Sequence, residues 1–297
     1  MKYAYFPGCS LMESAKEYDF STKVVMELLD GKLREIPDWG CCGATAVESV
    51  SRDLALSLAA RNLAIAEKVL PGIDVLAPCS ACYLNLRRVQ EELPKDRELM
   101  QLVNKILSVE DLAYYGSVSV RHLLDVLEND IGYERLGAHV QRDLSNLTVA
   151  PYTGCQVLRP YRVFDDPERP QVLAKILKTM GVNVHPWGHS SRCCGASLLA
   201  NHRAVGLEAV RSILEAAQGA DCIVTVCPMC QMNLELYQGT LGLRIPVLYL
   251  PQLMGIAYGF SSDFMRLDEN LSIPSTFLES MTPGVHAENF NNRPEGR

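Results

Sequence analysis

Short apolar runs and helical apolar periods alternate along this chain, and the alternation occurs twice. Residues 3–7 (YAYFP) and 147–152 (LTVAPY) are runs that lead to a glycine and a cysteine, which is typical of a strand ending in a loop. Helical periods follow over 21–29 and 171–180, the second ending before Gly181, a residue typical of a helix C-terminus. Alanine-rich helical stretches come next over 51–69 and 202–217, and apolar strands over 73–78 and 221–226.

This alternation of strands and helices predicts an α/β fold with parallel sheets flanked by helices. Because the same order appears in both halves, the chain is interpreted as two tandem, Rossmann-like domains made by internal duplication. The boundary is placed near Asn146, which gives domains of residues 1–146 and 147–297. The uncharged run from Ile245 to Ser262 contains prolines and glycines, so it predicts a buried strand followed by a helix and not a bilayer span.

The cysteines repeat in the same order in both halves. Of the eleven, ten fall into two sets with the order C, CC and CxxC, and the corresponding positions lie 146 to 152 residues apart. Neighbouring residues repeat as well: FPGC answers YTGC, WGCCGA answers WGHSSRCCGA, and CSACYLNL answers CPMCQMNL. The four residues HSSR are a local insertion in the second copy. Self-similarity of this kind indicates two copies of one ligand-binding unit.

Composition narrows the functions that this unit can serve. The chain has 297 residues, a formal charge of -7 and a pI near 5.5, and it shows no clustered basic face, which argues against nucleic-acid binding. It opens with no signal peptide, so we expect a cytoplasmic protein. In reducing cytosol, clustered cysteines indicate metal or redox chemistry more often than disulfides.

Several metal and redox sites are compatible with cysteines in general, but fewer with this spacing. Structural zinc and a set of disulfides stay as minor alternatives, and a thioredoxin-like role for CxxC is weaker still. Tyr83 and Gln231 follow the two CxxC pairs, so covalent c-type haem is excluded. Adjacent cysteines chelate one tetrahedral ion poorly but suit a site with several irons. Each group is predicted where a strand ends and a helix begins, and a helix N-terminus favours the negative charge of thiolates.

The doubled pattern resembles the CCG-domain, or cysteine-rich domain, family and within it the B subunit of heterodisulfide reductase. The resemblance covers nearly the whole chain, from YFPGC to CPMC, although the second CC-to-CxxC gap of 32 residues is slightly short for the family. It implies one noncubane [4Fe-4S] cluster in each half. The implied ligands of the first cluster are Cys9, Cys41, Cys42, Cys79 and Cys82, and those of the second are Cys155, Cys193, Cys194, Cys227 and Cys230.

The resemblance also implies an activity, which is reductive cleavage of a mixed disulfide between the two clusters. The substrate would be of the coenzyme M–coenzyme B type or a related small disulfide, and no side-chain acid or base is assigned to the reaction. The alternative is a noncatalytic electron-transfer component of a lactate, glycolate or succinate type of redox complex, since related proteins occur there. A zinc-stabilised assembly scaffold is a third and weaker hypothesis.

Electrons must come from another polypeptide, because the chain has no GxGxxG fingerprint, flavin signature or cubane-cluster run. The partners that the resemblance implies are a protein like the reductase's C subunit, with cubane [4Fe-4S] clusters, and a flavoprotein like its A subunit. In some complexes a hydrogenase or a formate dehydrogenase is attached. The polar tail from about Ser272 to Arg297 is a candidate partner contact or a disordered end.

The histidines near the cysteines are interpreted as structural. His185 and His189 flank Trp187 before the second CC pair, and they have no equivalent beside Trp39, so ordinary loop histidines are favoured over proton donors or iron ligands. His122 lies at a predicted helix start, and its interpretation is also structural, with lining of the substrate cavity as the alternative.

Five further polar residues are weighed in the same way. Asn85 and Asn233 each lie three residues after a CxxC pair, where a hydrogen bond to cluster sulfur and helix packing are nearly equal alternatives. Cys222 lies in an apolar strand with no counterpart and is expected to be an inert buried thiol. Arg87 and Arg88 are expected to be solvated helix charges, with an acidic partner or a substrate anion as the alternative.

Overall fold

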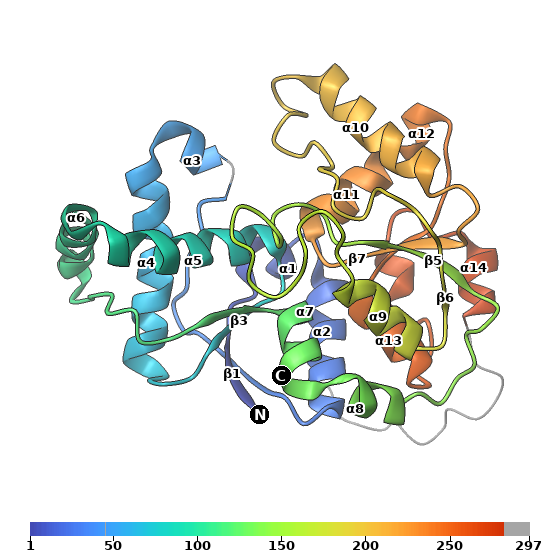
Figure 1. Ribbon diagram of the computed structural model, residues 1–297, viewed down its shortest axis with the longest axis horizontal. Helices are drawn as coiled ribbons and strands as arrows, with labels where there is room; N and C mark the ends of the chain where they lie inside the picture. The colour runs from blue at the N-terminus through green and yellow to red at the C-terminus, as the bar shows by residue number, and fades with distance from the viewer. Residues whose placement is uncertain (45, 282–297) are drawn as a thin grey trace.

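Two parallel sheets of four strands, with the same strand order, form the framework of the protein in the computed structural model (Figure 1). The structure describes residues 1–44 and 46–281. The first sheet has the order β2-β1-β3-β4 and comprises β1 (Lys2–Tyr5), β2 (Lys32–Glu35), β3 (Val75–Ala77) and β4 (Val120–His122). The second has the order β6-β5-β7-β8 and comprises β5 (Thr148–Tyr152), β6 (Asn183–Val184), β7 (Cys222–Thr225) and β8 (Val247–Tyr249). All strand pairs are parallel, which confirms the predicted tandem α/β fold.

Helices cover both sheets. The first half carries α1 (Gly8–Met12), α2 (Lys16–Leu28), α3 (Ala46–Val50), α4 (Arg52–Val69), α5 (Ser80–Glu92), α6 (Arg97–Leu107), α7 (Leu123–Val126) and α8 (Tyr133–Ala138). The second half carries α9 (Val172–Thr179), α10 (Arg203–Ala216), α11 (Pro228–Leu236), α12 (Gln238–Leu241), α13 (Leu250–Ala257) and α14 (Ser275–Ser280). Helices α4, α9 and α10 lie within two residues of their predicted bounds.

Helix α2 begins at Lys16, five residues before the predicted start at Ser21. The stretch KEYDF is largely polar, yet Glu17 and Tyr18 are buried, because this first turn packs against the other half of the protein. Tertiary contact has therefore extended the helix beyond its visible apolar period. Helix α6 corresponds to no element predicted from the sequence. The uncharged run after Arg244 forms β8 and α13, as predicted.

Helix contacts join the two halves of the protein. Helix α13 of the second half packs on α2 of the first, while α9 of the second half packs on residues 127–131, a π-helical turn that continues α7 (Figure 1). The rings of Tyr18 and Tyr249 stack at the centre, 4.2 Å apart and almost parallel. The larger hydrophobic cluster contains residues from both halves, so the tandem units share a core. The boundary near Asn146, two residues before β5, stays a prediction.

The described part of the predicted polar tail is folded onto the protein. The hydroxyl of Ser272 accepts a hydrogen bond from Val247 N, and Arg142 donates to the carbonyls of Ser280 and Met281. Residues 282–297 lie outside the described part of the chain. In that described part, no helix is both long enough and apolar enough to cross a membrane.

Candidate metal centre

The ten repeated cysteines lie at the carboxyl ends of the strands. Cys9 is in α1 immediately after β1, and Cys155 opens a turn immediately after β5. Cys79 and Cys227 are the residues at the N-termini of α5 and α11, both in extended conformation, and each follows a buried strand. The CC pairs lie in loops beyond β2 and β6. Because parallel strands end at one edge, the fold gathers residues far apart in sequence there.

In the second half, all five cysteines line one cavity of about 110 Å³. The Sγ atoms of Cys194 and Cys230 are 3.5 Å apart, and the neighbouring Cys155 thiol lowers the pKa of Cys193. Cys193 is exposed while Cys194, Cys227 and Cys230 are buried. Ser80, from the first half of the chain, lines the same cavity. The predicted second ligand set is therefore one spatial group that opens toward the other half.

In the first half, Sγ of Cys42 lies 3.4 Å from Sγ of Cys82. The Cys41 thiol interacts with Cys42, and that of Cys79 with Cys82, while Cys9 and Cys41 reach the surface. Gly8, just before Cys9, has φ +72°, and a Cβ placed on it would lie 2.6 Å from Cys82 Sγ. Gly154, its counterpart before Cys155, has φ +73° and the corresponding distance to Cys230 Sγ is 3.2 Å. Both glycines therefore leave space for a sulfur.

The two cysteine sets meet at the interface between the halves. The electrostatic influence of Cys227, its counterpart in the second copy, raises the pKa of the Cys79 thiol, so the two side chains lie near one another. The hydroxyl of Tyr18 is shared between the carbonyl oxygens of Pro78, at 3.0 Å, and Val226, at 3.2 Å, which are the residues before those cysteines. Tyr18 thus fixes the relative position of the two CxxC segments. Sequence reasoning missed it, because an aromatic residue in a polar stretch carries no signal of a contact across the duplication.

His122 supports the same interface through Ser80. Its Nδ1 accepts a hydrogen bond from Leu124 N at 3.2 Å, so the neutral ring carries its proton on Nε2, which lies 3.5 Å from Ser80 Oγ. Burial lowers the pKa of His122 to about 4, and the ring is therefore neutral at neutral pH. Ser80 Oγ in turn donates to the carbonyl of Val226 at 3.3 Å. This geometry agrees with the structural interpretation of His122.

The protonation of the thiols reflects their mutual contacts. Hydrogen bonds from neighbouring thiols lower the pKa values of Cys42 and Cys227, and a bond from Cys155 lowers the pKa of Cys193 to about 6. Hydrogen bonds with Cys42 and Cys194, together with burial, raise the pKa values of Cys82 and Cys230. The sulfurs whose pKa is lowered, those of Cys42, Cys193 and Cys227, are soft donors of the kind that bind iron as thiolates.

The residues present fit a thiolate-bound cluster by the nature and number of their donors. Five thiols converge on a single cavity in the second half, and a Cβ is excluded where the CxxC sulfur approaches the backbone in each copy. Within residues 1–44 and 46–281, no group of three or more His, Cys, Asp or Glu side chains is arranged to hold one metal ion. The fit therefore rests on the shared cavity of the second half and on the sulfur contacts of Cys42 with Cys82 and of Cys194 with Cys230.

The two asparagines occupy equivalent positions. Asn85 Nδ2 donates to the carbonyl of Cys42 at 2.9 Å. Asn233 Nδ2 lies 3.3 Å from the carbonyl and 3.5 Å from Sγ of Cys194. Each amide thus holds the second cysteine of a CC pair against the helix that begins within CxxC. Only Asn233, in the second copy, also contacts a sulfur.

The remaining candidates occupy positions outside the cysteine group. His185 Nε2 lies 3.2 Å from the carbonyl of Ala216, and His189 Nε2 lies 3.1 Å from Ser212 Oγ, so both are tied to α10. Cys222 is fully buried and burial raises its pKa, as expected of an inert thiol.

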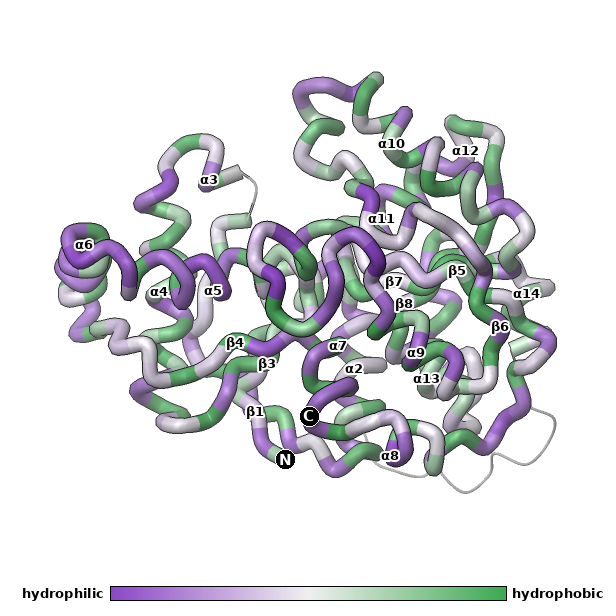
Figure 2. The backbone as a smooth tube through the Cα atoms, in the orientation of Figure 1, coloured by the Kyte–Doolittle hydropathy of each residue, from purple (hydrophilic) through white to green (hydrophobic). Residues whose placement is uncertain are grey.

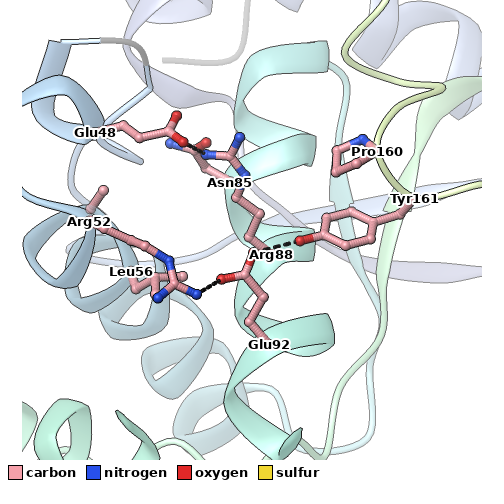
Figure 3. Close-up of a pocket in the computed structure, with 9 residues that line it drawn as sticks. Glu48, Arg52, Leu56, Asn85, Arg88, Glu92, Pro160 and Tyr161 are labelled. Atoms are coloured by element: carbon pink, nitrogen blue, oxygen red, sulfur yellow. Dashed lines mark hydrogen bonds and ion pairs between the residues drawn. The ribbon is translucent and has the colours of Figure 1, made fainter. Parts of the chain in front are cut away.

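The two arginines on α5 have separate ion-pair partners. Arg87 pairs with Glu91 at 2.8 Å, and Arg88 pairs with Glu48. Arg88 also lines a second cavity, of about 150 Å³, which lies against the first half (Figure 3).

Comparisons with known proteins agree with the repeated architecture. Residues 3–87 and 149–235 match the model of a cysteine-rich domain. The 8-methylmenaquinol:fumarate reductase membrane anchor subunit of Wolinella succinogenes is 36% identical over 91% of this chain and 96% of its own. The B subunit of the ferredoxin/F(420)H(2)-dependent CoB-CoM heterodisulfide reductase of Methanosarcina acetivorans is 30% identical over 91% of this chain and 93% of its own.

Among solved structures, a hypothetical protein from Helicobacter pylori has a similar fold. Its TM-score is 0.71 at 18% identity over 92% of this chain. This chain spans about half, 52%, of the length of that structure. The similarity at this identity concerns the fold alone.

Proposed function

The chain belongs to the cysteine-rich domain family, and on that premise we propose that it is the iron–sulfur component of an oxidoreductase that cleaves a small disulfide. Its ten repeated cysteines would hold two noncubane [4Fe-4S] clusters, one in each half. The observation that carries the proposal is the meeting of the two CxxC segments at the interface, where one Tyr18 hydroxyl binds the carbonyls that precede Cys79 and Cys227. A relative named as the B subunit of a heterodisulfide reductase, which aligns along most of this chain, supports the same reaction.

Bound clusters would supply electrons and iron atoms that capture sulfur. The overall reaction is RSSR′ + 2e⁻ + 2H⁺ → RSH + R′SH, so the S–S bond breaks and each sulfur gains one electron and one proton. A disulfide has two reacting ends, and this chain presents two equivalent cysteine sets, one for each end. Tyr18, through the carbonyls of Pro78 and Val226, holds the two sets at a fixed separation. Preorganisation of this kind lowers the barrier because little rearrangement is needed during reaction.

The protons have no assigned donor among the side chains. His122 is neutral and fully buried, and its Nε2 proton faces Ser80, which lines the cysteine cavity. In this proposal Ser80 orients substrate, while solvent at the exposed Cys193 side protonates the product thiolates. The partners that would supply electrons are a C-subunit-like protein with cubane clusters and an A-subunit-like flavoprotein, and a cytoplasmic location is part of the same proposal.

A second candidate function is electron relay without disulfide chemistry. The 36% identity to a fumarate reductase component favours it specifically. In that case the clusters would pass electrons between partner proteins, and a disulfide would not be a substrate. The sulfur contacts within each half, between Cys42 and Cys82 and between Cys194 and Cys230, suit relay as well as catalysis.

Metal analysis of anaerobically purified protein tests the clusters first. We expect about eight iron atoms per chain, and Cys42→Ala and Cys194→Ala should each lose iron. Cys222→Ala is the matched control, since it removes a buried thiol outside both sets and should keep full iron. Zinc without iron, or full iron in both cysteine variants, would contradict the cluster proposal.

Reduction assays then separate the two functions. With an artificial electron donor, the catalytic hypothesis predicts disulfide-dependent turnover and a thiol-induced paramagnetic signal in the oxidised protein. The relay hypothesis predicts neither, but it predicts electron transfer to a partner protein that reduces fumarate. Disulfide turnover that survives Cys194→Ala unchanged would refute catalysis at this site.

A further inference from the structure

A charged cavity of about 150 Å³ lies beside the cysteine site, between α3, α4 and α5 and the loop that connects β5 to α9 (Figure 3). Arg88 pairs with Glu48 on one side of it. On the other side, Glu92 accepts hydrogen bonds from Arg52 at 2.6 Å and from Tyr161 at 2.7 Å. The two ion pairs face one another across the cavity, and each guanidinium has five N–H donors, most of which these bonds leave available.

The charged cavity and the cysteine cavity share two walls. Helix α5 supplies Ser80 to the cysteine cavity and Arg88 to the charged one. At a rise of about 1.5 Å per residue these positions are separated by about 12 Å along the helix axis. The loop after β5 supplies Cys155 to the cysteine cavity and Tyr161 to the charged cavity. Figure 2 shows that this loop is hydrophilic over much of its length. Asn85, between them on α5, lines the charged cavity and holds the Cys42 carbonyl.

The second half has no such cavity lining at the equivalent positions. In the aligned segments CCGATAVE and CCGASLLA, Glu48 corresponds to Ala200. In the segments after CxxC, Arg88 corresponds to Leu236 and Glu92 to Thr240, and Leu236 is half exposed. The duplication is therefore symmetric in its cysteines but not in the charges beside them. A ligand that spans both sets would meet ionic groups at one end only.

We propose that the charged cavity binds the zwitterionic α-amino-acid end of a sulfur-containing ligand, with the ligand's sulfur directed toward the cysteine site. This inference rests on the proposed function only for the fate of that sulfur. The carboxylate would be bound by Arg52 and Arg88, and the ammonium by Glu48 and Glu92. Both members of each ion pair thereby keep a partner of opposite charge.

Charge and size favour this class of ligand. The lining carries two arginines and two glutamates, so a zwitterion leaves it neutral. A simple anion would leave the occupied cavity with a net negative charge, in a chain whose formal charge is already -7. A cavity of about 150 Å³ accommodates a group of about six heavy atoms, as a cavity of that size takes up benzene. An amino-acid head group has that size, whereas a nucleotide or a complete cofactor does not fit.

Binding of S-methyl-L-cysteine to the anaerobically purified holoprotein tests the proposal without any reduction step, because this thioether cannot be reduced as a disulfide. Calorimetry should show that it binds about tenfold or more tightly than methylthiopropionate, which lacks the ammonium, and S-methylcysteamine, which lacks the carboxylate. Equal affinities for the three probes, or no binding of S-methyl-L-cysteine, would overturn the proposal.

Two variants locate the binding. Arg88→Leu copies the residue of the second half, so the helix tolerates it, and it should weaken S-methyl-L-cysteine binding by about tenfold or more. Glu48→Gln should weaken S-methyl-L-cysteine but strengthen methylthiopropionate, a reversal that misfolding would not produce. Arg87→Leu is the matched control, since Arg87 is adjacent on α5 and pairs with Glu91 outside the cavity. An unchanged affinity in Arg88→Leu, or an equal loss in Arg87→Leu, would contradict the assignment.

The binding and reduction results are independent. Selective binding of S-methyl-L-cysteine without disulfide turnover would support the cavity and defeat the proposed catalytic function. Turnover of an uncharged disulfide without that binding would defeat the cavity proposal alone.

Discussion

Gly8→Ala should remove the first cluster, because the added methyl group would occupy the place of a ligand sulfur. The new Cβ would lie 2.6 Å from Cys82 Sγ, about 1 Å inside ordinary van der Waals contact. Cys82 is buried, so its sulfur can move only by leaving the position that the fold gives it. Functional groups must be held within about 0.5 Å to act, and a shift of about 1 Å exceeds that tolerance.

Gly72→Ala separates this clash from backbone strain. Gly72 has the same φ of +72°, but no atom lies within 4 Å of its new Cβ. The left-handed conformation costs an alanine about 1 kcal/mol in either variant. Any further loss in Gly8→Ala is therefore due to Cys82.

Iron content and urea unfolding of the two anaerobically purified variants provide the assay. Gly72→Ala should keep about eight irons per chain, whereas Gly8→Ala should keep about four. Both should lose about 1 kcal/mol of unfolding free energy from strain alone. Full iron in Gly8→Ala, or equal iron loss in Gly72→Ala, would refute the reasoning.

Three further variants probe other contacts. Gly154→Ala should cause a milder loss of iron from the second cluster, because its Cβ would lie 3.2 Å from Cys230 Sγ, a distance that small shifts relieve; a loss as complete as that in Gly8→Ala would contradict this. Tyr18→Phe should lower the unfolding free energy by about 2 kcal/mol in urea, since it leaves two buried carbonyls without their shared donor; a change below about 0.5 kcal/mol would argue against the bridge. Burial raises the pKa of Glu235 to about 7, so the folded protein holds a proton that the unfolded chain releases above pH 4.5. Stability from this group is thus lost as pH rises from 4.5 to 7, by about 3 kcal/mol, and Glu235→Gln should flatten that slope in urea titrations; an unchanged slope would exclude Glu235 as its source.

The sequence by itself determined the duplicated architecture. Strand and helix periods are local properties of the chain, and the order C, CC and CxxC is preserved in both copies, so both could be compared by reading along the sequence. The strands before Cys79 and Cys227 were predicted for this reason, and the structure has them as β3 and β7. Helix α2 shows the limit of such reading, because the burial of its first turn depends on α13 of the other half.

Only the tertiary structure decided how the copies face one another. The bridge from Tyr18 to Val226 spans 208 residues, and the charged cavity unites Glu48 and Arg88 with Tyr161 from the second half. No periodicity records such contacts, because they form between side chains that become neighbours only after the two sheets have folded and packed. The sequence thus determined the repeated cysteine pattern and the absence of Glu48, Arg88 and Glu92 equivalents in the second copy, while packing decided that the two CxxC segments meet and that Tyr161 closes the charged cavity.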